Sequence, residues 1–410
     1  MNYSILFSKD IVVFMCGMLS SIFVARHLGP EIYGSYVFVI LILAYFLNFG
    51  RFRESISMLP YIKRNVDQKE IVFSLGLVIN LTMSAISILL LLIIGPTFGL
   101  FENISVFVYP VLAVMIISES FMVYTTYILS YESNYRLLAG LSIFRSIFQT
   151  AGFAYLFFFS QTEKDILPYL GINAASVLLA ALIGFYFIRT NMNFLFTGFR
   201  EMNLKYYLKT GGLFYATDLI NFLSVKGVAS YVAAKMAVSN LAFFNMIFTH
   251  FDLLRFPNNA LGTMMYPELS KIVSDVDQRS YIHRKIKINL IIYPIILIAA
   301  YFLYPKLVLL FYGQEYAIVA EYFPYVILIG GPYLIVYPII HYFSSNGHPQ
   351  YEGYIKLFSL FIQIASVVFF THAQNFTLYH AILSQAVGFI SFTIALAIIY
   401  NLKKLGEKHG

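Results

Sequence analysis

The chain has 410 residues, of which 60% are hydrophobic and 11% are charged, and its formal net charge is +7. Soluble domains are about 45–50% apolar and about 25% charged, so this composition excludes an ordinary water-soluble fold. Apolar runs of about 20 residues recur between short polar segments, the pattern of a polytopic helical membrane protein. We see no segments of about 10 residues with alternating hydrophobicity, which would be typical of a membrane barrel.

Twelve membrane spans are predicted from these apolar runs, which gives an all-α fold. The first has no small-residue cleavage pattern, and we expect it to stay uncleaved. The predicted spans are 11–26, 33–50, 71–95, 107–130, 138–160, 167–188, 211–230, 237–261, 287–305, 320–343, 356–372 and 379–400.

The distribution of Lys and Arg predicts that both termini are cytoplasmic. With that orientation, 21 of the 27 Lys and Arg residues lie in cytoplasmic segments, four lie outside, and Arg145 and Lys226 lie within spans. Such a bias towards the inside is the usual determinant of membrane topology. It also explains the positive net charge without a nucleic-acid partner, and we expect none.

The connections between spans carry no motif for a cofactor or a reaction. The longest, residues 262–286, has no glycine-rich phosphate loop, no His/Glu metal spacing and no nucleophile elbow. The single cysteine, Cys16, excludes an intramolecular disulfide and a cysteine metal cluster. We therefore expect no catalytic residue, no metal and no cofactor other than a coupling H⁺ or Na⁺, and a protein that is not an enzyme.

The two halves of the chain show a weak internal repeat. At an offset of 214 residues, Pro110 corresponds to Pro324 and Gln149 to Gln363. Six spans in each half would leave both halves in the same orientation, as in transporters built from parallel repeats. The repeat predicts two six-helix lobes, residues 1–200 and 201–410.

Ionisable residues within the predicted spans are candidates for function, because a charge in the bilayer is costly unless it is paired or hydrated. Glu119 lies midway along the fourth span, and Arg145 lies in the fifth with Gln149 one turn further on the same face. Asp218 in the seventh span and Asp252 with Arg255 in the eighth repeat this arrangement. The eighth span carries a polar stripe of Asn245, Thr249, Asp252, Arg255 and Asn259.

A structural reading of these charges stays open beside the functional one. Glu119 with Arg145, and Asp218 with Arg255, would then be ion pairs that fix helix packing. Arg51 and Arg53, at the inner end of the second span, are orientation charges by the usual rule, yet they would also be the first cations to meet an anionic lipid headgroup.

Three passages resemble one transporter family. Residues 26–36 read Arg-x-Leu-Gly-Pro-Glu-x-Tyr-Gly-x-Tyr, residues 266–270 read Tyr-Pro-Glu-Leu-Ser, and residues 313–316 read Gly-Gln-Glu-Tyr. These passages resemble the Wzx-type flippases of O-antigen and capsule pathways, within the multidrug/oligosaccharidyl-lipid/polysaccharide exporter (MOP) superfamily. They are turn elements and carry no substrate-binding residue over to this chain.

The resemblance implies a multi-pass protein of the bacterial inner membrane that serves O-antigen, capsule or lipopolysaccharide biosynthesis. Its substrate would be an undecaprenyl-pyrophosphate-linked repeat unit, moved from the cytoplasmic to the periplasmic leaflet by alternating access, and its partners would include other polysaccharide-assembly proteins. From the buried charges themselves, we expect Arg145 and Arg255 to neutralise the pyrophosphate or acidic sugars, with Arg51 and Arg53 as further candidate cations for the substrate. The coupling carboxylates would be Glu119, Asp218 and Asp252.

Two other functions compete with the flippase. An ion-coupled exporter of drugs or organic cations would use the buried carboxylates as its binding groups. A polytopic glycan polymerase or ligase is a less favoured reading, because resembling enzymes usually carry a large outside loop and the outside connections here are short.

Overall fold

The structure is a computed structural model that describes most of the chain. The described residues are 2–50, 62, 66–102, 104–160, 164–191, 194, 204–255, 258, 265, 268–269, 272, 274–345, 349–373 and 375–402. Throughout them the regular secondary structure is helical, which confirms the predicted all-α fold. The chain divides into two compact units.

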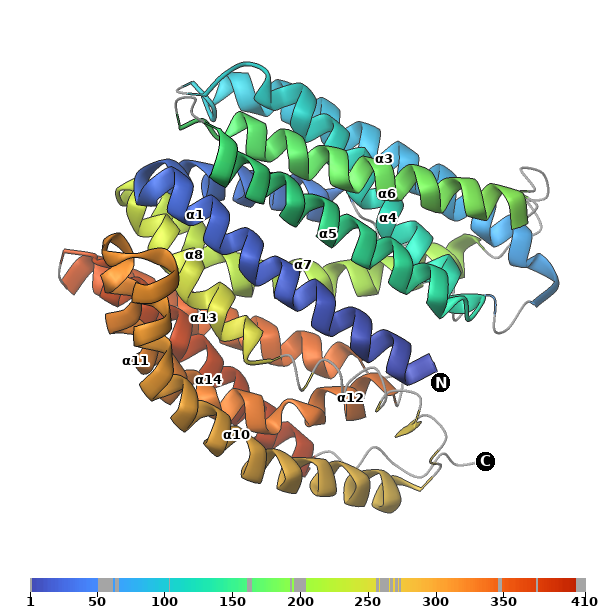
Figure 1. Cartoon of the computed structure of the whole chain (residues 1–410). Helices are drawn as coiled ribbons and strands as arrows, with labels where there is room; N and C mark the ends of the chain where they lie inside the picture. Colours follow the sequence, from blue (N-terminus) through green and yellow to red (C-terminus); the bar gives the residue numbers. More distant parts are fainter. Residues whose placement is uncertain are drawn as a thin grey trace. The chain divides into compact units, whose positions relative to one another are not determined.

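Unit 1 comprises Met1–Leu28 and Val39–Leu219. In it, α4 packs against α3, α5 and α6, and α5 packs against α6 (Figure 1). The helices that contribute to this unit are α1 (Asn2–Phe49), α3 (Lys69–Thr97), α4 (Val108–Tyr131), α5 (Tyr135–Phe159), α6 (Leu167–Asn191) and the first part of α7 (Leu204–Lys235), together with the 3-10 turn η1 (Val66–Gln68).

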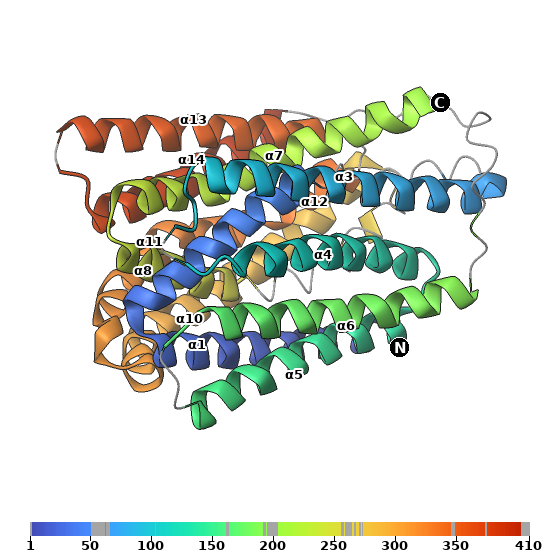
Figure 2. The same ribbon diagram turned by 90° about the horizontal axis from the view of Figure 1, so that it is seen from above.

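Unit 2 comprises Gly29–Phe38 and Ile220–Gly410. In it, α11 packs against α8, α10 and α14, while α13 packs along α14, as Figures 1 and 2 show. Its further elements are α8 (Val238–Leu253), α10 (Asp275–Tyr312), η3 (Gln314–Tyr316), α11 (Ala317–Val336), α12 (Pro338–Ser345), α13 (Pro349–Ala373) and α14 (Leu378–Leu402).

Each of the twelve predicted spans coincides wholly or in part with a helix of the described residues. Among the described residues, nine helices are long and apolar enough to cross a membrane. One of them, α1, contains the first and nearly all of the second predicted span, α7 contains the seventh, and α8 (Val238–Leu253) covers the first part of the eighth, most of whose remainder lies outside the described residues. The protein is therefore a multi-pass membrane protein, since its helices expose apolar side chains that only lipid can cover.

A break at Gly29 divides α1 into two helical stretches. Gly29 has φ 75° and ψ 167°, a conformation that is essentially restricted to glycine. Pro30 follows, and its nitrogen cannot donate a helical hydrogen bond. The predicted turn between the first two spans is confirmed at this point, although helix resumes directly after the break.

The start of α10 differs from the prediction, which placed residues 262–286 in a connection. The helix begins at Asp275, where the Ser274 hydroxyl accepts a hydrogen bond from the backbone N–H of Asp277 at 3.4 Å. Asp275 and Asp277 lie in the first turn, where the helix dipole favours carboxylates. Hydropathy missed this segment because its helix is polar and charged.

The predicted span 320–343 consists of two helices. Helix α11 ends at Val336, and α12 begins at Pro338, whose ring is compatible with the first position of a helix but not with its interior. A short helix, α12, with buried apolar residues such as Ile339 and Phe343, therefore follows α11 within unit 2.

Replacing Gly29 by Ala is expected to destabilise the protein by about 1–3 kcal/mol, the cost of holding a side chain in this backbone conformation. The matched control is Gly140→Ala in α5, where an added methyl group meets no atom within 4 Å and favours the helix. Thermal unfolding in detergent measures both variants. Equal midpoints would contradict the assignment of strain to Gly29.

Candidate functional site: a polar cavity in unit 2

A small polar cavity lies among the helices of unit 2. Its volume is about 100 Å³, which is the liquid share of about three water molecules. It is lined by polar residues and by the apolar residues that separate them: Asn221, Ser224 and Val225 of α7, Arg255, Tyr333 of α11, Lys356, Ser359 and Gln363 of α13, and Gln385, Gly388, Phe389 and Phe392 of α14.

Arg255 is the central cation of this cavity and lies just after the end of α8. Its Nη1 donates to Oδ1 of Asp252 at 2.9 Å. The guanidinium carbon lies 5.4 Å from the ring centre of Tyr333 and 5.3 Å from that of Tyr337, within cation–π range. Its Nε has no hydrogen-bond partner among the described residues, so one donor stays available.

Lys356 is a second cation on the cavity wall. Its ammonium group forms an ion pair with Glu352, one turn earlier on α13, and both side chains are about 85% buried. Glu352 also acts electrostatically on His341 of α12, whose ring packs edge-on against Tyr337. Arg255 and Lys356 thus belong to two charge pairs that border one cavity.

Two buried glutamines provide neutral polar groups. Gln363 and Gln385 are each 3% exposed, and Gln385 donates from Nε2 to the carbonyl of Ser224 at 3.2 Å. Neither side-chain carbonyl oxygen has a partner within the described part of the chain. An unpaired buried acceptor is costly, so these oxygens are suited to bind a hydroxyl group or water.

Gly388 makes room for one of these amides. A β-carbon at position 388 would overlap the side chain of Gln363. The neighbouring Ser359 hydroxyl donates to the Gly388 carbonyl at 2.6 Å, so α13 and α14 meet closely through polar groups at this point.

Unit 1 contains the predicted pair of Glu119 on α4 and Arg145 on α5. Arg145 Nη1 donates to Glu119 Oε2 at 3.2 Å, and Nη2 donates to Oε1. The side chain of Glu119 is 17% exposed and that of Arg145 is 28% exposed. This bidentate pair compensates both charges and leaves little of either for a ligand, while the half-buried Gln149 lies one turn along α5.

The structure does not bring the remaining predicted residues together at one site. On α8, Thr249 and Asp252 are exposed and Asn245 is half-buried, so the described part of the polar stripe lies on an accessible face. Asp218 is a half-buried residue of unit 1, and its predicted pairing with Arg255 of unit 2 stays a prediction. Arg51, Arg53 and Asn259 lie outside the described residues.

His250 belongs to a different polar cluster within unit 2. Its Nε2 is 2.9 Å from the Tyr312 hydroxyl, and its Nδ1 is hydrogen-bonded to the Tyr304 hydroxyl. Both ring nitrogens therefore have partners, and the Tyr304 ring stacks on Phe323. This satisfied network supports packing of α8 against α10.

Sequence reasoning missed most of the cavity wall. The distribution of Lys and Arg assigns Lys356 to a cytoplasmic segment, and the aromatic rings that hold Arg255 carry no distinguishing signal in the sequence. A search for amide side chains in the middle of apolar spans would have found Gln363 and Gln385, because such groups are rare in lipid and usually face a bundle interior.

No family model matches the sequence, and no curated protein matches it. Solved structures match over the whole chain. One of them is the outward-facing conformation of a multidrug resistance MATE family transporter of the MOP superfamily, with a TM-score of 0.71 and 14% identity over 100% of this chain and 96% of that one. The fold is that of the MOP superfamily transporters.

Two further structures agree with this result. The inward-facing conformation of a multidrug resistance MATE family transporter has a TM-score of 0.69 and 14% identity, covering 97% of this chain and 93% of its own. A MOP superfamily transporter from Pyrococcus furiosus, described as having a binding pocket of reverse polarity, has a TM-score of 0.68 and 15% identity, covering 98% and 95%. At 14–15% identity these likenesses concern the fold, which agrees with the fold that the sequence resemblance implies.

The Glu119–Arg145 pair predicts a specific pattern of stabilities. Glu119→Gln or Arg145→Gln alone leaves a partly buried charge without its partner and is expected to cost about 1–3 kcal/mol. The double variant Glu119→Gln/Arg145→Gln is expected to lose less than the sum of the single variants, because it removes both charges. Thermal unfolding in detergent measures the coupling, with the exposed Arg136→Gln as the control.

Proposed function

We propose that the chain is a membrane transporter that moves an anionic, lipid-linked oligosaccharide from the cytoplasmic to the periplasmic leaflet of the bacterial inner membrane. The fold supports a transporter, since solved structures of this fold include inward-facing and outward-facing conformations. The observation that carries the substrate class is the cavity of unit 2, where Arg255 and Lys356 lie beside unpaired amide oxygens.

The chemistry of these groups suits a sugar attached to pyrophosphate. A guanidinium with a free N–H binds phosphate oxygens, and an ammonium group adds a second positive charge. The oxygens of Gln363 and Gln385 accept hydrogen bonds, and sugar hydroxyl groups donate them. The cavity of about 100 Å³ holds one such group at a time, so a whole repeat unit requires a more open conformation.

The binding model assigns different tasks to the predicted residues. Arg255 binds the pyrophosphate, with Arg51 and Arg53 as the cations that meet the headgroup first. Arg145 is held by Glu119 and acts on the substrate only if that pair opens. The two six-helix lobes, residues 1–200 and 201–410, would alternate access between the leaflets, and the undecaprenyl chain would stay in lipid. Other polysaccharide-assembly proteins would supply and use the repeat unit.

Asp252 is the best-placed of the carboxylates proposed to couple transport to an ion. Its side chain is 50% exposed, and one of its oxygens binds Arg255. Binding of H⁺ or Na⁺ to Asp252 would weaken its hold on Arg255, so the ion and the anionic substrate would compete for the same pair of residues. Glu119 and Asp218 are the further candidates.

Export of drugs or organic cations is the second candidate function. It is favoured by the structural neighbours, whose titles name multidrug resistance transporters. It would use Asp252, Glu119 and Asp218 as binding groups. The unit 2 cavity weighs against it, because Arg255 and Lys356 line the cavity whereas their partners Asp252 and Glu352 do not.

Removal of either cavity cation is expected to reduce translocation of a lipid-linked oligosaccharide at least tenfold, since a hydrogen bond to a charged group contributes about 1.5–3 kcal/mol. The variants are Arg255→Gln and Lys356→Gln, with exposed Arg136→Gln as the control. The measurement is the fraction of a fluorescent pyrophosphate-linked oligosaccharide that crosses the bilayer of proteoliposomes containing equal amounts of protein.

The same preparations separate the two candidate functions. If wild-type protein moves an organic cation but no lipid-linked oligosaccharide, and Asp252→Asn abolishes that movement, drug export replaces the flippase. Normal oligosaccharide translocation by both cation variants would refute the assignment of the cavity.

A further inference from the structure

The first turns of α10 carry cations of two kinds. Arg279 is fixed, because its Nε lies 2.9 Å from Asp275 Oδ2 and its guanidinium carbon lies 5.3 Å and 4.9 Å from the ring centres of Tyr342 and Tyr400. Arg284 and Lys287 are exposed, and neither has an ion-pair partner among the residues that the structure describes. These two cations are therefore free to bind an anion.

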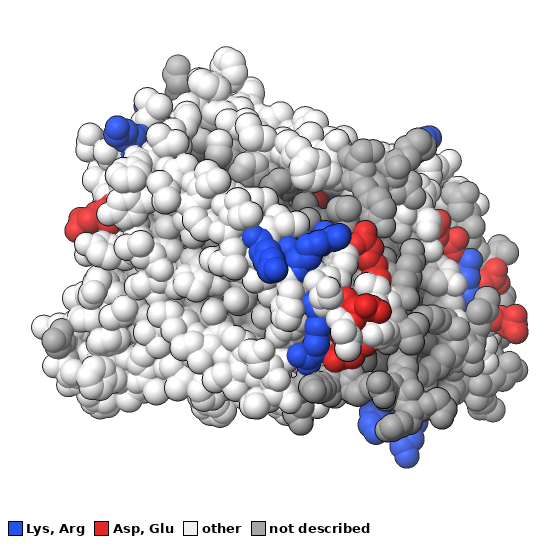
Figure 3. Space-filling model, turned by 90° about the horizontal axis from the view of Figure 1, so that it is seen from below, with Lys and Arg blue, Asp and Glu red and all other residues white. Residues whose placement is uncertain are grey.

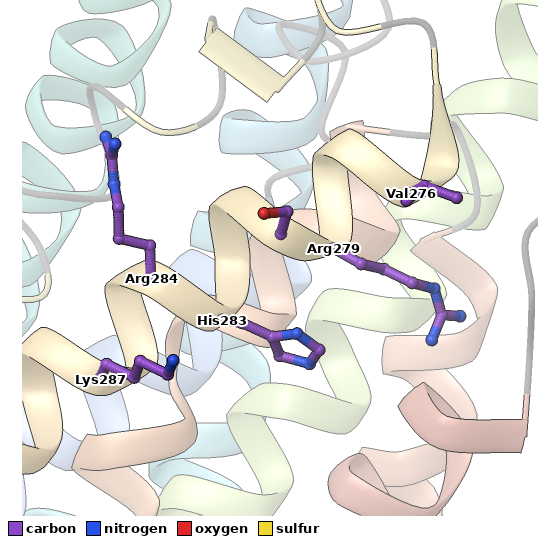
Figure 4. A pocket seen from close by; sticks show the side chains of 6 residues that line it. Val276, Arg279, His283, Arg284 and Lys287 are labelled. Atoms are coloured by element: carbon purple, nitrogen blue, oxygen red, sulfur yellow. The ribbon is translucent and has the colours of Figure 1, made fainter.

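A wide cavity of about 590 Å³ adjoins these residues, and Val276, Arg279, Ser280, His283, Arg284 and Lys287 line it. Figure 4 shows the labelled side chains on successive turns of one helix, with Arg284 and Arg279 pointing in different directions. Seen from below, the surface carries a group of Lys and Arg side chains, with Asp and Glu side chains on one side of it and a wide area without charged side chains on the other (Figure 3). A polar site here would therefore border an apolar surface.

The apolar surface continues along the same face of α10. Ile291, Ile298 and Phe302 are 68%, 60% and 65% exposed. Ideal helix geometry, with 100° and 1.5 Å per residue, places Ile298 about 20° around the helix from Lys287 and about 16 Å further along the axis, with Pro294 between them. Cations and apolar residues thus follow each other on one side of α10.

A groove between α10 and α11 lies at the apolar end of this face. It has a volume of about 350 Å³, and its lining is almost entirely apolar. The lining residues are Leu297, Ile298, Tyr301, Phe302, Ile327, Leu328, Gly331, Pro332 and Ile335. The distance of about 16 Å between Lys287 and Ile298 is close to half the hydrocarbon thickness of about 30 Å. The spacing fits a lipid whose headgroup lies at the cations and whose chain reaches the groove.

We propose that this face of α10 is a binding site for an anionic glycerophospholipid of the membrane, with the phosphate at Arg284 and Lys287 and an acyl chain in the groove between α10 and α11. A general role in fixing membrane orientation would account for the positive charge of Arg284 and Lys287 and for the side of the membrane on which they are predicted to lie. It does not account for two unpaired cations directly in line with an apolar groove. The site is separate from the transport cavity and does not depend on the proposed substrate.

The headgroup half of the site is tested by lipid selection. The full chain is reconstituted into vesicles of equimolar phosphatidylglycerol and phosphatidylcholine, and native mass spectrometry counts the lipids retained after extraction. Wild-type protein is expected to retain phosphatidylglycerol preferentially. Arg284→Gln and Lys287→Gln should each reduce that preference about fivefold, the factor that corresponds to about 1 kcal/mol per cation at an anionic surface.

The control is Lys205→Gln/Lys209→Gln, which removes two exposed cations of α7 that are predicted to lie on the same side of the membrane. This variant should keep the preference of the wild type. If the control and Arg284→Gln/Lys287→Gln lost the preference for phosphatidylglycerol equally, the proposal would be overturned, because the preference would then depend only on the total charge of the protein. Displacement of phosphatidylglycerol by millimolar inorganic phosphate would also overturn it and would indicate a site for the free anion.

The chain half of the site is tested by filling the groove. Leu328 is 65% exposed, so Leu328→Trp adds volume to the groove without entering the core. We expect it to lower retention of both lipids severalfold while leaving the headgroup preference unchanged. Ile364→Trp, on an exposed position of α13 outside the groove, is the matched control. Unchanged retention in Leu328→Trp would show that no chain occupies the groove.

Discussion

Polar groups inside an apolar helical bundle have no bulk water to bind, and each must find its partner on a neighbouring helix. Asn80 donates to the carbonyl of Ser120 at 3.2 Å, and Glu119 binds Arg145 through both oxygens. His250 uses both ring nitrogens. Such contacts join helices that are distant in the sequence, and they hold each unit together where apolar packing alone would be unspecific.

Exceptions to this rule occur in both units: the buried hydroxyl groups of Ser84, Thr125 and Ser384, for example, have no hydrogen-bond partner among the described residues. Three exceptions meet at one cavity of unit 2. The Nε of Arg255 and the side-chain oxygens of Gln363 and Gln385 lack partners among the described residues, and all three groups belong to the lining of one cavity. Elsewhere in the same unit, Asn258 and Asn289 bind each other at 3.0 Å and share the carbonyl of Leu334. The grouping of one N–H donor and two amide oxygens around a single cavity supports a ligand-binding role there.

The sequence was sufficient to predict the helices, because apolar runs of membrane length are a strong local signal. The break at Gly29 and the pair of Glu119 with Arg145 were also predictable, the first from Gly-Pro and the second from the cost of a lone charge in lipid. The start of α10 was not, because a charged helix outside the apolar run has no hydropathy signal. The cavity was not predictable either, since it depends on contacts such as that of Gln385 with Ser224, 161 residues away in the chain.

The aromatic rings beside Arg255 have a consequence for the thermodynamics of binding. A free arginine side chain has about 2 kcal/mol of rotamer entropy to lose when a ligand immobilises it. Tyr333, Tyr337 and Asp252 already restrict the Arg255 guanidinium before any ligand is present. Most of that entropy is therefore lost during folding, and an incoming anion meets a donor whose orientation is already set.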